Sequence, residues 1–172
     1  MHTTPAIQTP VAGAYRVDTS ASTISFATRH VFGLGTVRGT FALRDGQVDV
    51  GEPVTSSFAR ATVSAASVDT GVAARDHAVR SATYLGAEYH PFIDFASTNL
   101  ERDGERWVLH GGLTVRGVTR PVALELAEVR VAGPRLRVIA TTVVDRYEFG
   151  VTAMRGMAGR RLRMRIEITA TR

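Results

Sequence analysis

Histidines are the residues of this chain best suited to acid–base chemistry or metal binding, and there are five of them. No two are spaced as in HxxxH or HExxH, the arrangement with which a helix presents paired metal ligands. The chain has no cysteine, which excludes disulfides, thiolate metal ligands and thiol nucleophiles, and it has no GxSxG sequence for a serine nucleophile. We therefore expect no catalytic group, no metal and no cofactor.

His30 is the histidine with the strongest case for a ligand contact. It ends an apolar strand face and precedes the glycine-rich segment 31–35, so it is expected at the mouth of a cavity. A core histidine hydrogen-bonded to the backbone fits the same pattern. His77 and His90 flank a predicted helix, and His110 points outward from a predicted strand, so we expect these three to be surface or capping residues.

The overall composition is that of a single globular domain. Of the 172 residues, 44% are hydrophobic and 22% are charged. The net charge is +5 and all 21 basic residues are arginine, which permits contact with nucleic acid or an anionic surface. No helix-turn-helix, zinc or RNP-like pattern accompanies the arginines, so we expect no nucleic-acid partner.

Targeting and membrane signals are missing from the sequence as it stands. No apolar run approaches the roughly 20 residues that span a bilayer, so no integral membrane segment is expected. Residues 1–13 contain neither a basic region nor an apolar region of the kind that opens a secretory signal. We interpret them as a flexible N-terminal arm and expect a cytoplasmic protein.

A period of two dominates the sequence and predicts strands with one apolar face. The clearest case is 107–126, which is predicted to be a hairpin with its turn at 116–121. The apolar parity slips after Leu126, which predicts a β-bulge near Ala127. The same alternation predicts further strands at 22–30, 36–43, 136–144 and 162–170.

Two segments are predicted to interrupt the strands. Residues 71–89 do not alternate, and their small and apolar residues fit a helical stripe that Asp69 or Thr70 could cap. A turn is also predicted at Arg44–Asp45–Gly46, because Asp-Gly is a strong signal for a hairpin turn.

About eight strands with hairpin connections and one short helix predict an antiparallel barrel or sandwich. The charged residues fall on the outward faces, which is the reverse of a lipid-facing outer-membrane barrel. Small inward residues such as Gly39, Gly111 and Ala140 leave room for an elongated apolar molecule. The alternative is that large neighbouring side chains fill this room.

Four segments in order resemble the signatures of the YceI-like family of polyisoprenoid-binding proteins. They are YRVDTSASTISFATRHVFGLGTVRGTF, ARDHAVRSATYLGAEYHPFIDFASTNL, LHGGLTVRGVTRPVAL and VVDRYEFGV. The resemblance implies that residues 14–172 form an all-β domain with one short helix, an eight-stranded antiparallel β-barrel that is lipocalin-like in shape. It also implies a long isoprenoid chain in the interior and no catalysis.

The resemblance gives the candidate residues their roles. His30 and Arg146 are candidates for contact with a polar head such as a quinone carbonyl or a pyrophosphate. For Arg146, a structural pair with Asp145 or Glu148 is the alternative. The loops at 31–35 and 147–157 are expected to close over the apolar tail. The predicted ligand-binding residues are Phe26, His30, Phe32, Leu34, Phe41, Phe95, Trp107, Leu113, Leu124, Arg146, Phe149, Met154 and Met164.

The expected function is binding of a polyprenyl or isoprenoid-quinone type of lipid for carriage, storage or sequestration. A fatty acid or fatty amide in the same cavity is an alternative ligand. Two alternatives belong to other classes: an enzyme acting on an apolar substrate with His30 as general base, and a scaffold whose barrel is solid. The family often forms dimers, so a homodimer is a further expectation.

Overall fold

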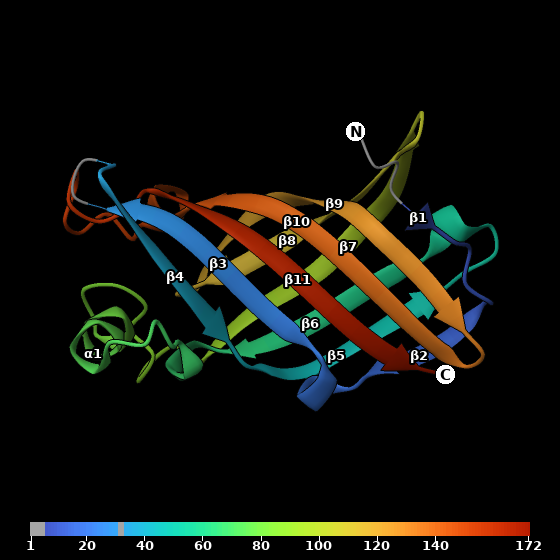
Figure 1. Ribbon diagram of the computed structural model, residues 1–172, viewed down its shortest axis with the longest axis horizontal. Helices are drawn as coiled ribbons and strands as arrows, with labels where there is room; N and C mark the ends of the chain where they lie inside the picture. Colours follow the sequence, from blue (N-terminus) through green and yellow to red (C-terminus); the bar gives the residue numbers. More distant parts are fainter. Residues whose placement is uncertain (1–5, 31–32) are drawn as a thin grey trace.

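The computed structural model of the protein describes residues 6–30 and 33–172 (Figure 1). These residues form eleven strands, one α-helix and four short 3-10 helices. The strands are β1 Ala6–Ile7, β2 Gly13–Val17, β3 Thr23–His30, β4 Gly35–Phe41, β5 Leu43–Val50, β6 Phe58–Ser64, β7 Phe92–Asp103, β8 Arg106–Val115, β9 Val118–Ala132, β10 Arg135–Asp145 and β11 Arg161–Thr171. The helices are η1 Thr19–Ala21, η2 Val54–Ser56, η3 Ala65–Ser67, α1 Ala73–Arg80 and η4 Arg146–Phe149.

The strands close into one barrel. β5 to β9 pair in sequence order, β9 pairs with β10, and β10 pairs with β11, which returns to β2 and β3. β2 and β3 pair with successive parts of β11, so together they act as one interrupted strand. On their other side, β3 pairs with β4 and β2 pairs with β5, so β4 and β5 together act as a second interrupted strand. Counted in this way, the barrel has eight antiparallel strands, which confirms the predicted fold class.

Asp18 explains the interruption between β2 and β3. Its carboxylate accepts hydrogen bonds from the backbone N–H groups of Ser20 and Ala21, at 3.0 and 3.3 Å, and so caps η1. The chain thereby makes a short turn and rejoins the same edge of β11.

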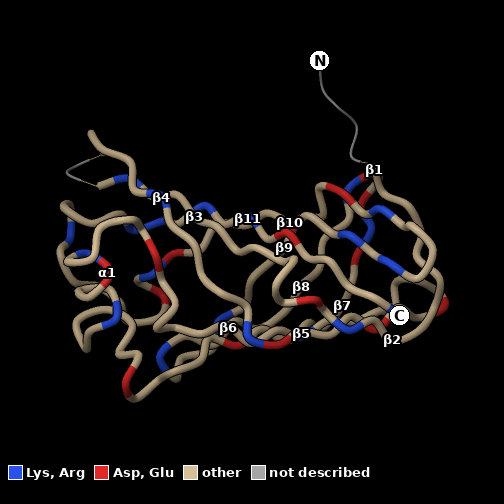
Figure 2. Tube along the Cα trace, turned by 60° about the horizontal axis from the view of Figure 1, so that its bottom comes forward, with Lys and Arg blue, Asp and Glu red and all other residues tan. Residues whose placement is uncertain are grey.

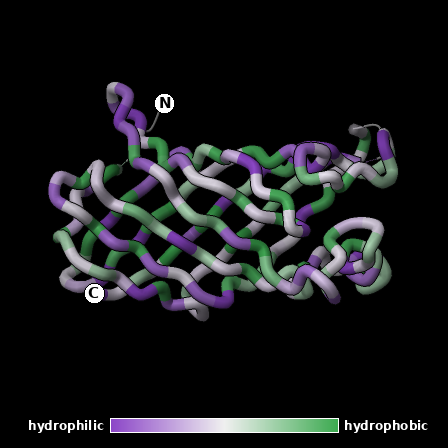
Figure 3. The backbone as a smooth tube through the Cα atoms, turned by 180° about the vertical axis from the view of Figure 1, so that it is seen from behind, coloured by the Kyte–Doolittle hydropathy of each residue, from purple (hydrophilic) through white to green (hydrophobic). Residues whose placement is uncertain are grey.

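The alternation of apolar and polar residues runs along the whole barrel wall (Figure 3). Charged residues of both signs are spread over the wall and its loops (Figure 2). Fully buried side chains lie where β2, the start of β10 and the end of β11 meet, with Tyr15, Leu136 and Ala170 all at most 1% exposed. This cluster lies at the end of the barrel opposite α1.

The predicted bulge at Ala127 is confirmed. Glu128 pairs with Ile139 and Leu126 pairs with Ala140, so Ala127 is the extra residue on β9. The bulge restores the inward direction of Val129 and Val131 after the change of parity.

The predicted turn at Asp45–Gly46 is wrong. Both residues lie inside β5, and the register shift between Leu43 and Asp45 makes Arg44 the extra residue of a bulge. Gly46 instead allows the side chain of Val17 on β2 to lie close to the backbone of β5, since a Cβ at this position would lie 2.9 Å from Cγ2 of Val17.

Two other predicted elements are shorter in the structure. The turn predicted at 116–121 comprises only Arg116 and Gly117, which both have positive φ, and Pro121 lies inside β9 where this strand pairs with β8 alone. The helix predicted at 71–89 ends at Arg80, and turns follow it. None of the described helices has the length and apolar character needed to cross a membrane.

Part of the segment interpreted as a flexible arm is attached to the barrel. Ala6 and Ile7 form β1, which pairs in parallel with Glu128 and Val129 of β9. β9 extends here beyond its pairing with β8, which stops at Glu125, so β1 occupies an edge that would otherwise be unpaired.

Candidate functional site

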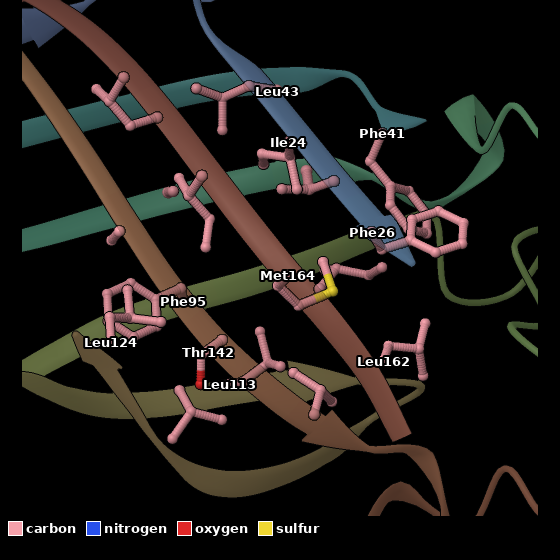
Figure 4. Close-up of a pocket in the computed structure, with 18 of the residues that line it drawn as sticks. Ile24, Phe26, Phe41, Leu43, Phe95, Leu113, Leu124, Thr142, Leu162 and Met164 are labelled. Atoms are coloured by element: carbon pink, nitrogen blue, oxygen red, sulfur yellow. The ribbon is translucent and has the colours of Figure 1, made fainter. Parts of the chain in front are cut away.

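A cavity of about 660 Å³ occupies the barrel interior. Its wall is built from the inward faces of the strands and is almost entirely apolar. Figure 4 shows side chains from several strands pointing into one space, among them Phe26 and Phe41, Phe95 and Leu113, and Met164. A cavity of this size and character suits a ligand with a long hydrocarbon part. The solid barrel considered from the sequence is therefore not what the structure shows.

Two glycines help to keep the barrel hollow. The ring of Phe26 lies over Gly39 on the paired strand, where a Cβ would be 2.5 Å from the ring. The ring of Phe95 lies in the same way over Gly111. Each aromatic side chain lies along the wall because its neighbouring strand has no side chain at that position. The centre of the cavity is left free.

Most of the predicted ligand-binding residues face this cavity. The lining includes Phe26, His30, Phe41, Phe95, Trp107, Leu113, Leu124, Arg146, Phe149, Met154 and Met164. Leu34 is 88% exposed and lies outside the lining, whereas Phe32 lies outside the described residues. Contact of these residues with a ligand stays a prediction.

The guanidinium of Arg146 holds the loop that precedes β11. It donates to the backbone carbonyls of Val151, Ala153 and Gly159 at 2.7 Å and to that of Ala158 at 3.2 Å. Its side chain is buried, and four of its five N–H donors are used in this way. The structural pair considered for Arg146 is therefore made with carbonyl groups and not with Asp145 or Glu148.

Asp145 pairs instead with Arg160 at the other end of the same loop. Nε of Arg160 donates to both carboxylate oxygens, at 3.0 and 2.9 Å. The Asp145 carboxylate also accepts from the backbone N–H of Tyr147. These bonds, the one from Arg160 above all, hold the pKa of Asp145 below its ordinary value of 3.8.

Residues 70–85, which include α1, line the cavity at the same end of the barrel as Arg146. Arg80 fixes α1 to η3 through the carbonyls of Ala66 and Val68. Asp76 is buried and accepts hydrogen bonds from the side chain and backbone of Thr70, which lower its pKa. The predicted capping of the helix by Asp69 or Thr70 is wrong. The N-cap is Val72, whose side chain makes no capping bond, and Asp76 within α1 instead accepts from Thr70.

Sequence reasoning missed two parts of the lining. Tyr84 follows α1, lines the cavity and packs 5.7 Å from the guanidinium of Arg146. Residues 7–10 border the cavity at the opposite end, where Gln8 accepts a hydrogen bond from the backbone N–H of Val131 at 2.7 Å. The large apolar residue Ile7, in a Thr- and Pro-rich lead, was the available signal for this attachment.

His30 lies at the end of β3, and its ring lines the cavity and packs against Gly35. Its position at the mouth agrees with the first of the two interpretations of this residue. In the part of the chain that the structure describes, no three His, Asp or Glu side chains form a group that could hold a metal ion. His110 is a surface residue, as predicted, and its ring lies 2.8 Å from the Glu101 carboxylate.

Residues 15–170 match the YceI-like domain family. The chain belongs to this family. The match begins inside β2 and ends one residue before the end of β11, so it covers α1 and all of the barrel wall apart from β1, the first two residues of β2 and the last residue of β11.

Curated relatives of this YceI-like chain are found in several bacteria. It is 35% identical over 118 residues to Protein YceI of Escherichia coli O157:H7, which is 67% of this chain and 61% of that protein. It is 31% identical over 170 residues to a UPF0312 protein of Serratia proteamaculans (strain 568), which is 94% of this chain and 88% of that protein.

Solved structures share the barrel. BcnA of Burkholderia cenocepacia superposes with a TM-score of 0.80 at 20% identity, over 90% of this chain and 99% of that one. A polyisoprenoid binding domain from Saccharophagus degradans, implicated in plant cell wall breakdown, superposes with a TM-score of 0.70 at 14% identity, over 91% of this chain and 97% of that one. At these identities the likeness establishes the YceI-like fold.

Proposed function

We propose that the protein binds a long-chain isoprenoid lipid, of the polyprenyl or isoprenoid-quinone type, inside the barrel for carriage, storage or sequestration. The observation that carries this proposal is the apolar cavity of about 660 Å³ in the barrel interior. Membership of the YceI-like family supports it, as does the likeness to a solved domain described as polyisoprenoid-binding. The proposed role is binding without catalysis, in the cytoplasm.

The hydrophobic effect is sufficient to hold such a ligand. Burial of each methylene-sized group contributes about 0.8 kcal/mol, so several isoprene units bind tightly without a strong polar contact. Affinity should therefore rise with chain length until the cavity is filled. His30, Arg146 and Tyr84 line the cavity at the α1 end, and we infer that the polar head lies there; the opposite end, lined by Gln8 and Thr9, is the alternative.

The ligand can be identified from the protein as purified. Native mass spectrometry followed by organic extraction should find a polyprenyl or quinone-like species at about one per barrel, in keeping with the size of the cavity in the described residues. A fatty acid or fatty amide in its place would change the ligand class. A protein that is purified empty and takes up no added prenyl lipid would contradict the proposal.

A pair of variants on β9 tests whether the ligand lies in the lumen. Leu124 lines the cavity, whereas the neighbouring Ala123 is exposed on the outer face. Leu124→Arg places a charge in the apolar space and should abolish uptake of a prenyl lipid. Ala123→Arg is the matched control and should bind as the parent does, with folding of both variants checked by circular dichroism.

A further inference from the structure

Two loops at the mouth of the cavity expose large apolar side chains. Leu34, just before β4, is 88% exposed, and Met154 and Met157, between η4 and β11, are 57% and 40% exposed. Exposed apolar residues that cluster on one face mark an interaction site, whereas single scattered ones need no explanation. We call these two segments, residues 33–35 and 150–160, the lip.

The two parts of the lip lie side by side. Gly159 packs directly against the side chain of Thr28 and the carbonyl of Arg29, near the end of β3. The hydroxyl of Thr28 donates to the carbonyl of Arg161 at 2.8 Å. Figure 1 shows residues 33–35 and 150–160 at the same end of the barrel, above α1.

The lip is continuous with the cavity. Met154 and Met157 line the interior and are also exposed to solvent. Methionine is flexible and polarisable, so these side chains can adapt to neighbours of irregular shape. A molecule leaving the cavity at this end passes directly over the apolar surface of the lip.

The lip and the strand ends beside it are rich in positive charge. Residues 29–38 and 145–161 contain six arginines and two carboxylates. One of the carboxylates, Asp145, is already paired with Arg160, whereas Arg29, Arg155 and Arg161 are exposed. The segment around α1 contributes no comparable excess, since residues 69–90 hold two arginines against three carboxylates.

We propose that the lip docks the barrel on an anionic lipid bilayer, with Leu34 and the two methionines inserted among the headgroups and the arginines against lipid phosphates. Charge complementarity selects this partner, because peripheral binding depends on both buried apolar surface and attraction to anionic lipids. The mouth of the cavity then faces the bilayer, and a lipid tail passes between them without crossing water.

This inference extends the proposed function but can be tested apart from it, because docking is measured with protein stripped of any bound lipid. Wild-type protein is sedimented with vesicles of phosphatidylcholine alone and with vesicles of phosphatidylcholine and phosphatidylglycerol in equal amounts. Binding is expected to the mixed vesicles, and it should weaken as salt is added, because salt screens exposed charges. No binding to the mixed vesicles, or equal binding to both kinds, would overturn the proposal.

Variants show whether the lip is the surface that binds. Arg155→Glu should weaken binding to the mixed vesicles by about fivefold or more, since one basic residue near such a surface contributes about that factor. Leu34→Ser should weaken binding to a similar degree. Val11→Ser and Arg135→Glu are matched controls at the opposite end of the barrel, where Val11 is 51% exposed, and they should bind as the parent does.

Two results would assign binding elsewhere. Equal losses in the lip variants and the controls would mean that overall charge and not the lip drives association. Lip variants that bind normally would remove the lip from the interface. Docking through the lip by a protein that takes up no prenyl lipid would leave this inference standing and overturn the proposed function alone.

Discussion

The ring of Phe95 on β7 covers Gly111 on β8, so closely that a Cβ at this glycine would lie 2.5 Å from the ring and 2.6 Å from the carbonyl oxygen of Ala96. The neighbouring Gly112 faces the other side of the strand, and a Cβ there would meet only the Thr119 methyl group, at 3.2 Å. Two adjacent glycines thus differ sharply in the space around them.

Gly111→Ala should push the ring of Phe95 into the lumen and so reduce both stability and ligand capacity. Overpacking of this kind costs about 1–3 kcal/mol. Urea denaturation measures the stability, and titration with prenyl lipids of increasing length measures the capacity. Gly112→Ala is the control and should change both much less. Equal effects of the two substitutions would show that Phe95 does not set the free volume of the lumen.

Arg146→Met should loosen the loop between η4 and β11. The substitution leaves the carbonyls of Val151, Ala153, Ala158 and Gly159 without their donor, and we expect a loss of about 3 kcal/mol of stability. Limited proteolysis should cut the variant within residues 150–160 before it cuts the barrel. Arg146→Lys should not restore resistance, because an ammonium group cannot reproduce the planar fork. A stable, resistant variant would contradict this role.

Stability should fall in acid partly through Asp145. Its pKa in the folded protein is lowered from 3.8 by the hydrogen bonds from Arg160, while the unfolded chain protonates it near 3.8. The pair therefore stabilises the fold fully above about pH 3.8 and loses this contribution as the pH falls through the folded pKa.

The acid slope of the free energy of unfolding measures this effect. Asp145→Asn should be less stable than the parent at neutral pH and should approach it as the pH falls. Arg160→Gln removes the other partner and should flatten the slope to a similar degree. An Asp145→Asn protein with the full acid slope would mean that other carboxylates account for it.

Removal of residues 1–10 should open the barrel end opposite α1. Ile7 and Gln8 border the cavity there, and the truncated chain leaves the N–H of Val131 without its hydrogen bond. Release of a fluorescent fatty acid, followed by stopped flow, should become faster. Gln8→Ala should give part of the effect, and Leu34→Ser, at the other end, should give none. An unchanged rate in the truncated protein would mean that exchange does not use this end.

The alternation of apolar residues was enough to predict the wall of the barrel. It placed Leu113, Leu124 and Met164 correctly on the inner face because a strand gives each residue only two directions. The bulge at Ala127 followed from the same rule, since a change of parity within one strand requires an extra residue. Most of the predicted site consists of these inward positions.

Features that depend on distant neighbours could not be predicted in this way. Asp45–Gly46 carries a local turn signal, but its pairing with Thr62 and Ala61 of β6 keeps it in a strand. The partners of Arg146 are backbone carbonyls, which have no signature in the sequence. β1 forms because β9 has an unpaired edge, and this edge is created by the end of β8 and not by Ala6 or Ile7.

The pairing of β11 with β2 and β3 also determines when the fold can be completed. Ala170 pairs with Val17 and Arg163 pairs with Ala27, so residues near the two ends of the chain meet in the wall. Contacts of such long sequence separation form slowly. β2 and β3 therefore have an unpaired edge until β11 has been synthesised. A ribosome-bound chain without β11 would thus expose both its apolar lumen and the unpaired edges of its strands, which favours aggregation. Pairing of the eleven residues of β11 covers these edges and closes the lumen.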